Sequence, residues 1–132
     1  MTDFPESYRD LFDAYAGILS TIGSSGIPQS SAVWFVYDDG ELHSWLSDAR
    51  QKVKNLLERP EFSLLILDTA NPDRYLALRG RAELVPDNDL RLVGDKLAAK
   101  YGRELRSFRR EGETRYAVTF HATSVFARDA GG

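Results

Sequence analysis

The chain has 132 residues, 42% of them hydrophobic and 28% charged, a composition ordinary for one globular domain with a modest core. Its net charge of -3 argues against nucleic-acid binding, and the absence of cysteine excludes disulfides, thiolate metal sites and cysteine nucleophiles. No apolar run reaches the ~18 residues of a membrane span. The N-terminus lacks the basic and apolar regions of a secretory signal, so a cytoplasmic protein is expected.

The first half of the chain predicts a short helix followed by three strands. Pro5 suits the first turn of a helix, and apolar residues recur at helical spacing up to Tyr15. The Gly-Ser-Ser-Gly at 23–26 and the Asp-Asp-Gly at 38–40 are typical of turns. The β-rich segments around them are expected to form strands over 17–22, 30–37 and 41–47.

A basic helix is expected next. Its N-cap is expected at Ser47 or Asp48, and Arg59-Pro60 ends it because the position before a proline disfavours helical geometry. The side chains expected to be buried follow helical spacing and are Val53, Leu56 and Leu57.

Three cations, Arg50, Lys52 and Lys54, occupy the first two turns of this helix. A helix N-terminus carries roughly half a positive charge, so bases are unfavourable there unless an anion lies among them. Free main-chain N–H groups at the same end bind anions as well. We interpret the cluster as a phosphate site. The simpler alternative is a solvated charged face beside a capped helix end.

The second half of the chain predicts three more strands and one more helix. The helix begins at Asp87-Asn88 and ends at Gly102, and a polar, loop-like stretch follows it over 103–113. The strands are expected over 62–68, 74–85 and 116–126, the second and third with regular alternation of apolar residues. Residues 129–132 are expected to be a flexible tail.

This order of elements predicts a single mainly β (α+β) domain over 1–132, with an N-terminal helix within 1–16. Six strands joined by short hairpins favour a six-stranded antiparallel β-barrel with flanking helices. Two strands, over 32–37 and 64–67, are apolar at consecutive positions and therefore on both faces. Because a barrel interior buries one face only, helices or another subunit must cover the other face. With only three modest helices predicted, a homodimer is the simpler cover.

The chemistry visible in the sequence is that of a binding site rather than a hydrolase. His43 and His121 are far apart in sequence and are expected to be ordinary strand residues, and no metal is predicted. No nucleophile–base motif occurs. Trp34 and Trp45 lie on adjacent predicted strands, where they either flank a flat ring or pack in the core. An anion clamp beside an aromatic wall suits a flat, phosphorylated, redox-active cofactor.

Several segments together resemble the pyridoxamine 5'-phosphate oxidase-like split-barrel flavoproteins, the FMN-binding split-barrel type. Within them the chain looks most like the branch that uses the deazaflavin coenzyme F420. The resemblance covers about residues 10–128. The segments that carry it are GIPQSSAVWF at 26–35, DGEL at 39–42, SDARQKVKNL at 47–56, Arg59-Pro60 and LRGRAEL at 78–84.

The resemblance implies a homodimer with two cofactor sites at the subunit interface. Arg50 and Lys52 would hold the cofactor phosphate, with Gln51 between them. The ring and ribityl chain would lie along residues of two strands, namely Gln29, Ser30, Ser31, Ala32, Trp45 and Leu46. The other subunit would supply Arg74, Tyr75 and Leu76. Four arginines at 103, 106, 109 and 110 either form a groove for the acidic tail of the deazaflavin or belong to a solvated loop.

The function implied is an F420-dependent oxidoreductase that transfers hydride from reduced deazaflavin to a small unsaturated or quinone-like substrate. In such an enzyme the protein supplies position and water exclusion. The alternatives are an FMN-binding protein for electron transfer or flavin handling, a non-catalytic deazaflavin carrier, and a cofactor-free interaction protein. No residue is identified as catalytic.

Overall fold

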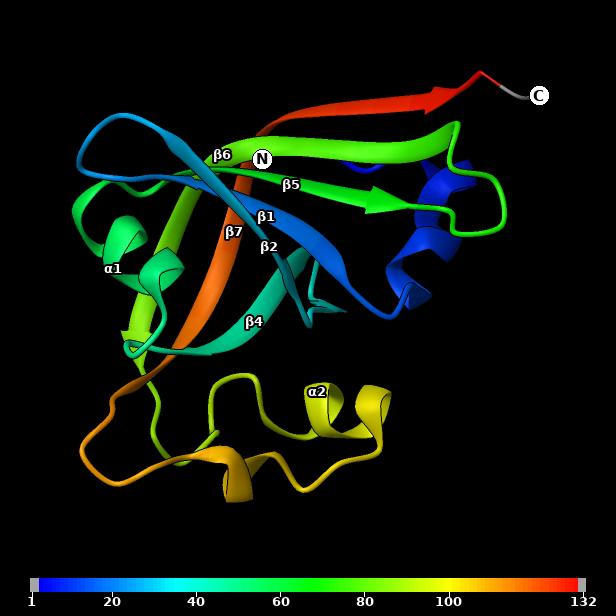
Figure 1. Cartoon of the computed structure of the whole chain (residues 1–132). Coiled ribbons are helices and arrows are strands. Elements are labelled where there is room, and N and C mark those ends of the chain that lie inside the picture. The colour runs from blue at the N-terminus through cyan, green and yellow to red at the C-terminus, as the bar shows by residue number, and fades with distance from the viewer. Residues whose placement is uncertain (1–2, 131–132) are drawn as a thin grey trace.

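Seven strands form one antiparallel sheet in the order β2-β1-β5-β6-β7-β4-β3 (Figure 1). The structure is a computed structural model and describes residues 3–130. Its elements are η1 Glu6–Asp13, β1 Gly17–Ile22, β2 Pro28–Val33, β3 Val36–Asp38, β4 Glu41–Ser47, α1 Gln51–Glu58, β5 Glu61–Leu67, β6 Arg74–Pro86, α2 Gly94–Tyr101, η2 Leu105–Phe108 and β7 Arg115–Asp129. None of the helices within 3–130 is long and apolar enough to span a membrane.

The chain connection between β2 and β3 closes the sheet into a split barrel. These strands are the two edges of the sheet, yet only Trp34 and Phe35 separate them in the chain. The sheet must therefore curl until its edges lie close together, without the edges pairing. The predicted antiparallel split barrel is confirmed. Its strand count is corrected to seven, because the run expected as one strand over 30–37 crosses from one edge to the other.

The barrel interior is a continuous apolar core. Leu19, Leu64, Leu78 and Phe120 are completely or almost completely buried in it. The predicted alternation in β6 is confirmed, since Leu76, Leu78 and Ala82 point inward while Arg79 and Arg81 are exposed. Each inward residue of one strand meets inward residues of its neighbours, and this packing holds the curled sheet.

A β-bulge between β6 and β7 depends on Gly80. The register shifts between Arg79 and Gly80, so that Thr123 on β7 is the extra residue. A Cβ at Gly80 would lie 1.9 Å from the carbonyl oxygen of His121, which only glycine avoids. Because of the extra residue, Val125 continues the inward face of β7 beyond the bulge.

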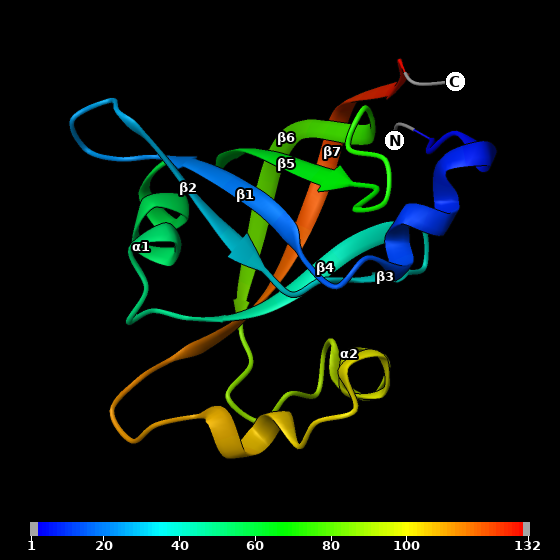
Figure 2. The ribbon, with the colours of Figure 1, turned by 45° about the vertical axis from the view of Figure 1, so that its right-hand side comes forward.

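A second, smaller core lies outside the barrel, between the outer face of β4 and β7 and the segment that contains α2 and η2 (Figure 2). Trp45 of β4 is 6% exposed and donates its Nε1–H to Asp87 O at 2.7 Å. Leu97 of α2 and Leu105 of η2 pack against the same cluster. This core attaches the segment between β6 and β7 to the barrel wall.

The expected helices and termini need several corrections. The first helix is a 3-10 helix, and Tyr15 lies beyond it and is 67% exposed, because the chain is already extended at Ala14 before entering β1. The helix expected from Asp87 begins at Gly94. The carboxylate of Asp87 instead accepts the N–H groups of Arg91 and Leu92 in the preceding turn.

The last strand is longer than predicted. It runs to Asp129, and Ala130 N–H donates to Asp73 O, so the expected flexible tail does not begin at residue 129. Residues 131–132 of that tail, and residues 1–2 of the expected N-terminal helix, lie outside the described residues.

Candidate functional site

The turn between β4 and α1 brings the predicted cations to the start of the helix. The N-cap is Arg50, which is extended and makes no capping side-chain bond, so the N-caps expected at Ser47 and Asp48 are wrong. Both side chains are used elsewhere. Ser47 Oγ donates to the Glu113 carboxylate, and Asp48 Oδ1 accepts the N–H of Thr114.

The buried face of α1 also differs from the prediction. Val53 and Leu56 are buried as expected, but Leu57 is 49% exposed. Asn55 takes its place in the interior and donates to Thr21 Oγ1 at 3.1 Å. Asn55 is buried because polar partners on β1 and β2, Thr21 and Gln29, lie opposite it.

Arg50 and Lys52 carry positive charge that the protein does not neutralise. Within residues 3–130 neither forms an ion pair with a carboxylate, and Lys52 Nζ donates to Ala32 O at 3.2 Å. Burial, and then repulsion by Arg50, lowers the pKa of Lys52. Among the described residues, the main-chain N–H groups of Gln51 and Lys52 have no acceptor. An anion bound here would satisfy all of these groups.

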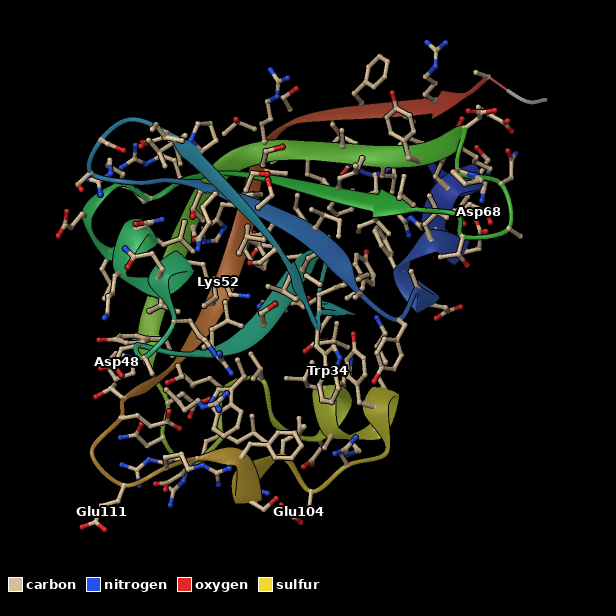
Figure 3. The ribbon with its side chains drawn as sticks, viewed as in Figure 1. Trp34, Asp48, Lys52, Asp68, Glu104 and Glu111 are labelled. Atoms are coloured by element: carbon tan, nitrogen blue, oxygen red, sulfur yellow. The ribbon has the colours of Figure 1, made fainter. Side chains whose placement is uncertain are left out.

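The two cations line a cavity of about 620 Å³ that also has an aromatic part. Figure 3 shows Lys52 beside α1 and Trp34 near α2, so the polar and aromatic parts of the lining come from different elements. The lining residues are Ala32, Val33, Trp34, Trp45, Leu46, Ser47, Ala49, Arg50, Lys52, Phe108, Arg110, Glu113 and Arg115.

Trp34 is held by an aromatic cluster at the end of α2. Its ring stacks on Tyr101 with centroids 4.3 Å apart and planes 8° apart, and Phe108 lies 6.2 Å away. The hydroxyl of Tyr101 donates to Tyr15 O at 2.7 Å and accepts the N–H of Phe35 at 3.0 Å. These contacts give the cavity a fixed flat wall, which suits a planar ring.

Five of the predicted site residues line this one cavity. They are Arg50, Lys52, Ala32, Trp45 and Leu46. Gln51 is exposed on α1 and donates to Asn55 Oδ1.

The remaining β2 residues divide between the two faces of the strand. Gln29 and Ser31 pair with inward residues of β1, whereas Ser30 bonds Ser20 Oγ on the outer side. Ser31 Oγ is buried and has no hydrogen-bond partner among the described residues.

Arg74, Tyr75 and Leu76 lie at the start of β6, away from the cavity of their own chain. Arg74 pairs with Asp10 at 2.7 Å and Asp68 at 3.2 Å. Tyr75 lies on the outer face of the sheet with Phe126. The side chain of Leu76 is fully buried in its own core, so only its main chain is left for a partner's site. Their role toward a second subunit stays a prediction.

Sequence reasoning missed most of the part of the cavity that the segment between α2 and β7 supplies, and it named only Arg110, as one of four candidate arginines for a groove. Phe108, Arg110, Glu113 and Arg115 all belong to its lining. The segment reads as a solvated loop because it is rich in arginine and glutamate. Its one signal was the spacing of Leu105 and Phe108, which form η2 and pack toward the second core.

The two histidines lie on strands, as expected. His43 Nδ1 bonds Thr119 Oγ1, and His121 lies between the carboxylates of Glu41 and Glu83. Residues 3–130 contain no group of three or more metal-binding side chains of the usual kinds.

The fold and the cavity define an antiparallel split barrel with two cations, Arg50 and Lys52, at the turn before α1. The chain belongs to the pyridoxamine 5'-phosphate oxidase family, whose sequence profile matches residues 4–129. No protein with a curated description matches the sequence. Family membership supports a split-barrel oxidoreductase type of function.

Solved structures with this fold differ in what their names describe. An F420 reductase is 30% identical, with 93% of this chain and 98% of that chain covered and a TM-score of 0.79. A conserved hypothetical protein from Mycobacterium tuberculosis is 26% identical, with coverage of 96% and 85% and a TM-score of 0.78. HutZ, a heme storage protein from Vibrio cholerae, is 14% identical at 96% coverage of both chains and a TM-score of 0.69, which shows the fold alone.

Proposed function

We propose that the protein is an oxidoreductase that binds coenzyme F420 and passes hydride from its reduced form to a small unsaturated or quinone-like molecule. The observation that carries this proposal is the uncompensated pair Arg50 and Lys52 at one part of a cavity whose other part is aromatic. A phosphorylated flat cofactor presents the matching groups. The cofactor supplies the hydride, and the protein positions the ring and excludes water.

The residues present fit the cofactor phosphate and ring. Arg50 and Lys52 would bind the phosphate together with the free N–H groups at the start of α1. Ala32, Leu46 and the Trp34 and Trp45 side chains would lie along the ring. The likeness to an F420 reductase favours the deazaflavin over FMN. An FMN-binding module is the second candidate, since both cofactors carry a phosphate.

A homodimer belongs to the same proposal. The outer face of β1, β6 and β7 carries the partly or fully exposed apolar side chains Ile18, Tyr75, Ala77 and Phe126, and Phe126 is 53% exposed. A second copy covering this face would remove them from water and place Arg74 and Tyr75 near a neighbouring subunit. Sedimentation equilibrium at micromolar concentration should give twice the chain mass, and a monomer that binds cofactor would overturn this part.

Cofactor titration tests the proposal directly. Protein purified from a host without the deazaflavin should be nearly colourless and should quench the fluorescence of added F420 with micromolar affinity or better. It should then oxidise reduced F420 when quinones or enones are supplied. A yellow preparation with stoichiometric FMN and no F420 binding would favour the FMN-binding module. No binding of either cofactor would overturn both.

A further inference from the structure

A carboxylate lies inside the cationic cavity, where charge alone makes it unfavourable for anion binding. Glu113 lines the cavity with Arg50 and Lys52, and its side chain is only 10% exposed. A negative charge at this place repels a phosphate bound by the two cations. Its position therefore needs an explanation other than direct contact with the ligand.

Three donors hold the Glu113 carboxylate. Its Oε2 accepts the hydroxyl of Ser47 at 2.5 Å, and its Oε1 accepts the main-chain N–H of Arg110 at 2.7 Å and the Nε–H of Arg115 at 3.1 Å. Burial opposes ionisation, but these hydrogen bonds and the charge of Arg115 together lower the pKa of Glu113 to about 2. The group is ionised throughout the physiological pH range, and three of its roughly four lone-pair sites are already used.

The same contacts join two segments that are far apart in sequence. Ser47 Oγ, which donates to Glu113, also accepts the N–H of Ala49 at 3.1 Å. One residue further, Asp48 and Thr114 exchange two hydrogen bonds, of 2.9 and 3.1 Å. The turn that presents Arg50 is thereby fixed to the segment that ends at β7.

The bonds also fix the side of the cavity opposite α1. Arg115, which donates to Glu113, lies over the Trp45 ring at 4.7 Å and donates to Phe108 O at 3.3 Å. The main-chain N–H of Arg110 donates to the Glu113 carboxylate, which holds Arg110 in place. One largely buried carboxylate therefore orders the turn before α1 and the Phe108–Arg110 part of the lining at once.

We propose that Glu113 is a positioning residue for anion binding, and that it acts through Ser47 to hold the turn that presents Arg50. The proposal rests on the proposed function, because the anion is the phosphate of the bound cofactor. Simple electrostatics predicts that cofactor affinity rises when the charge of Glu113 is removed, and this proposal predicts the opposite. Removing this negative charge should weaken cofactor binding, because the lost order outweighs the lost repulsion.

The test measures the dissociation constants of F420 and FMN by fluorescence titration at pH 8. Glu113→Gln keeps the size of the side chain and removes its charge, and we expect affinity to fall roughly tenfold. Glu111→Gln is the matched control, since Glu111 belongs to the same segment but is exposed and labelled at its outer edge in Figure 3. It makes the same charge change and should leave affinity unchanged or slightly higher. Unchanged or tighter binding by Glu113→Gln would overturn the proposal.

A double-mutant cycle separates positioning from general loss of stability. Ser47→Ala should also weaken binding, and adding Glu113→Gln to it should cost clearly less than in the wild type, because the link is already broken. Full additivity would contradict action through Ser47. If Glu113→Gln does not fold, Ser47→Ala alone tests the link, and unchanged binding there overturns it.

Failure of the Glu113 proposal can be distinguished from failure of the proposed function. If the wild-type protein binds neither cofactor, the proposed function fails before the variants are compared. If the wild type binds and Arg50→Ala with Lys52→Ala abolishes binding while Glu113→Gln does not weaken it, the anion site stands and the role of Glu113 is overturned.

Discussion

Two partly buried lysines, one on α1 and one on α2, differ in what the protein offers their ammonium groups. Lys100 Nζ donates to Phe12 O at 2.9 Å and Phe35 O at 2.8 Å, and it lies 3.7 Å from the centroid of the Phe35 ring. Lys52 Nζ donates to a single carbonyl at 3.2 Å, and the neighbouring charge that acts on it is that of Arg50. The first lysine has two carbonyl acceptors and an aromatic ring beside it, whereas the second has one carbonyl acceptor and a neighbouring cation.

The pKa shifts of the two lysines have the same main cause but different secondary ones. Burial lowers the pKa of Lys100 to about 8, and Asp13 partly opposes this shift. Burial also lowers the pKa of Lys52, and Arg50 adds to the shift instead of opposing it. A buried cation with acceptors around it is a structural contact. A partly buried cation beside another cation, with no ion pair to a carboxylate, is what a site for a ligand anion would require.

The largest expected effect is on cofactor affinity. Arg50→Ala combined with Lys52→Ala should weaken F420 or FMN binding by about 3 kcal/mol or more, because each charge-assisted hydrogen bond contributes roughly 1.5–3 kcal/mol. The free energy of unfolding without cofactor should be unchanged or slightly higher, since two cations that repel each other at a helix N-terminus are gone. Fluorescence titration and chemical denaturation measure the two quantities.

Lys54→Ala is the matched control for that experiment. Lys54 lies on the same helix and is exposed, and it does not belong to the cavity lining. Its removal should change affinity little. An equal loss in this control would mean that general surface charge, rather than the Arg50–Lys52 site, attracts the ligand.

The opposite pattern is expected at Lys100. Lys100→Met should lower the free energy of unfolding by roughly 1–3 kcal/mol, because two carbonyl groups of η1 and the β2–β3 connection lose their donor. Cofactor affinity should fall much less than in the double variant. Lys96→Met, on the exposed side of the same helix, should change the free energy of unfolding much less, since its ion pair with Asp38 is at the surface. A stability loss in Lys96→Met as large as in Lys100→Met would contradict the structural role of Lys100.

Raising the pH should increase stability through Lys100 and decrease cofactor affinity through Lys52. The folded pKa of Lys100, about 8, lies below its ordinary value of 10.5, so between these values the unfolded chain binds more protons and stability rises with pH. Relative to Lys100→Met, the wild type should gain about 1 kcal/mol over this range after allowing for partial exposure. Cofactor affinity should instead fall, because neutral Lys52 no longer attracts the phosphate. Denaturation and titration series at pH 8 to about 10.5 would show both trends. If stability and cofactor affinity changed in the same direction with pH, the two lysines would not have the different roles proposed for them.

The position of the two cations of the proposed anion site could be predicted from the sequence because it depends on local physics. Arg50 and Lys52 stand near a helix start, where helix polarity makes cations unfavourable without an anion. The alternating apolar residues of β6 likewise identify the inward face of the barrel, since alternation follows directly from strand geometry. Both inferences need only residues a few positions apart.

The other half of the site depends on contacts that the local pattern does not contain. Glu113 and Ser47 are 66 positions apart, and nothing near either residue indicates that they meet. The break at Trp34–Phe35 was missed for the same reason, because the run is uniformly apolar and its division is set by which sheet edge each part joins. Asn55 is buried because Thr21 and Gln29 lie opposite it, not because of its own helical spacing.

The smallest expected effect concerns a third kind of cation, one that is paired with carboxylates and exposed. His121 bonds Glu41 at 2.8 Å and Glu83 at 2.9 Å, and its side chain is 44% exposed. The hydrogen bond to Glu83, and then that to Glu41, raises the pKa of His121 against the effect of burial. Only the protonated ring donates from both nitrogens, so its stabilising effect is fully present below the ordinary value of 6.5 and is lost as pH rises through the raised pKa.

Comparing the wild type with His121→Gln isolates this effect, because every other titrating group is common to both. The wild type should be more stable near pH 6 by less than about 1 kcal/mol, and the difference should shrink as pH is raised and as salt is added. Thermal unfolding at several pH values measures it. A difference that grows with pH would mean that the neutral ring is the stabilised form of His121. The two carboxylates would then not stabilise a positive charge on it.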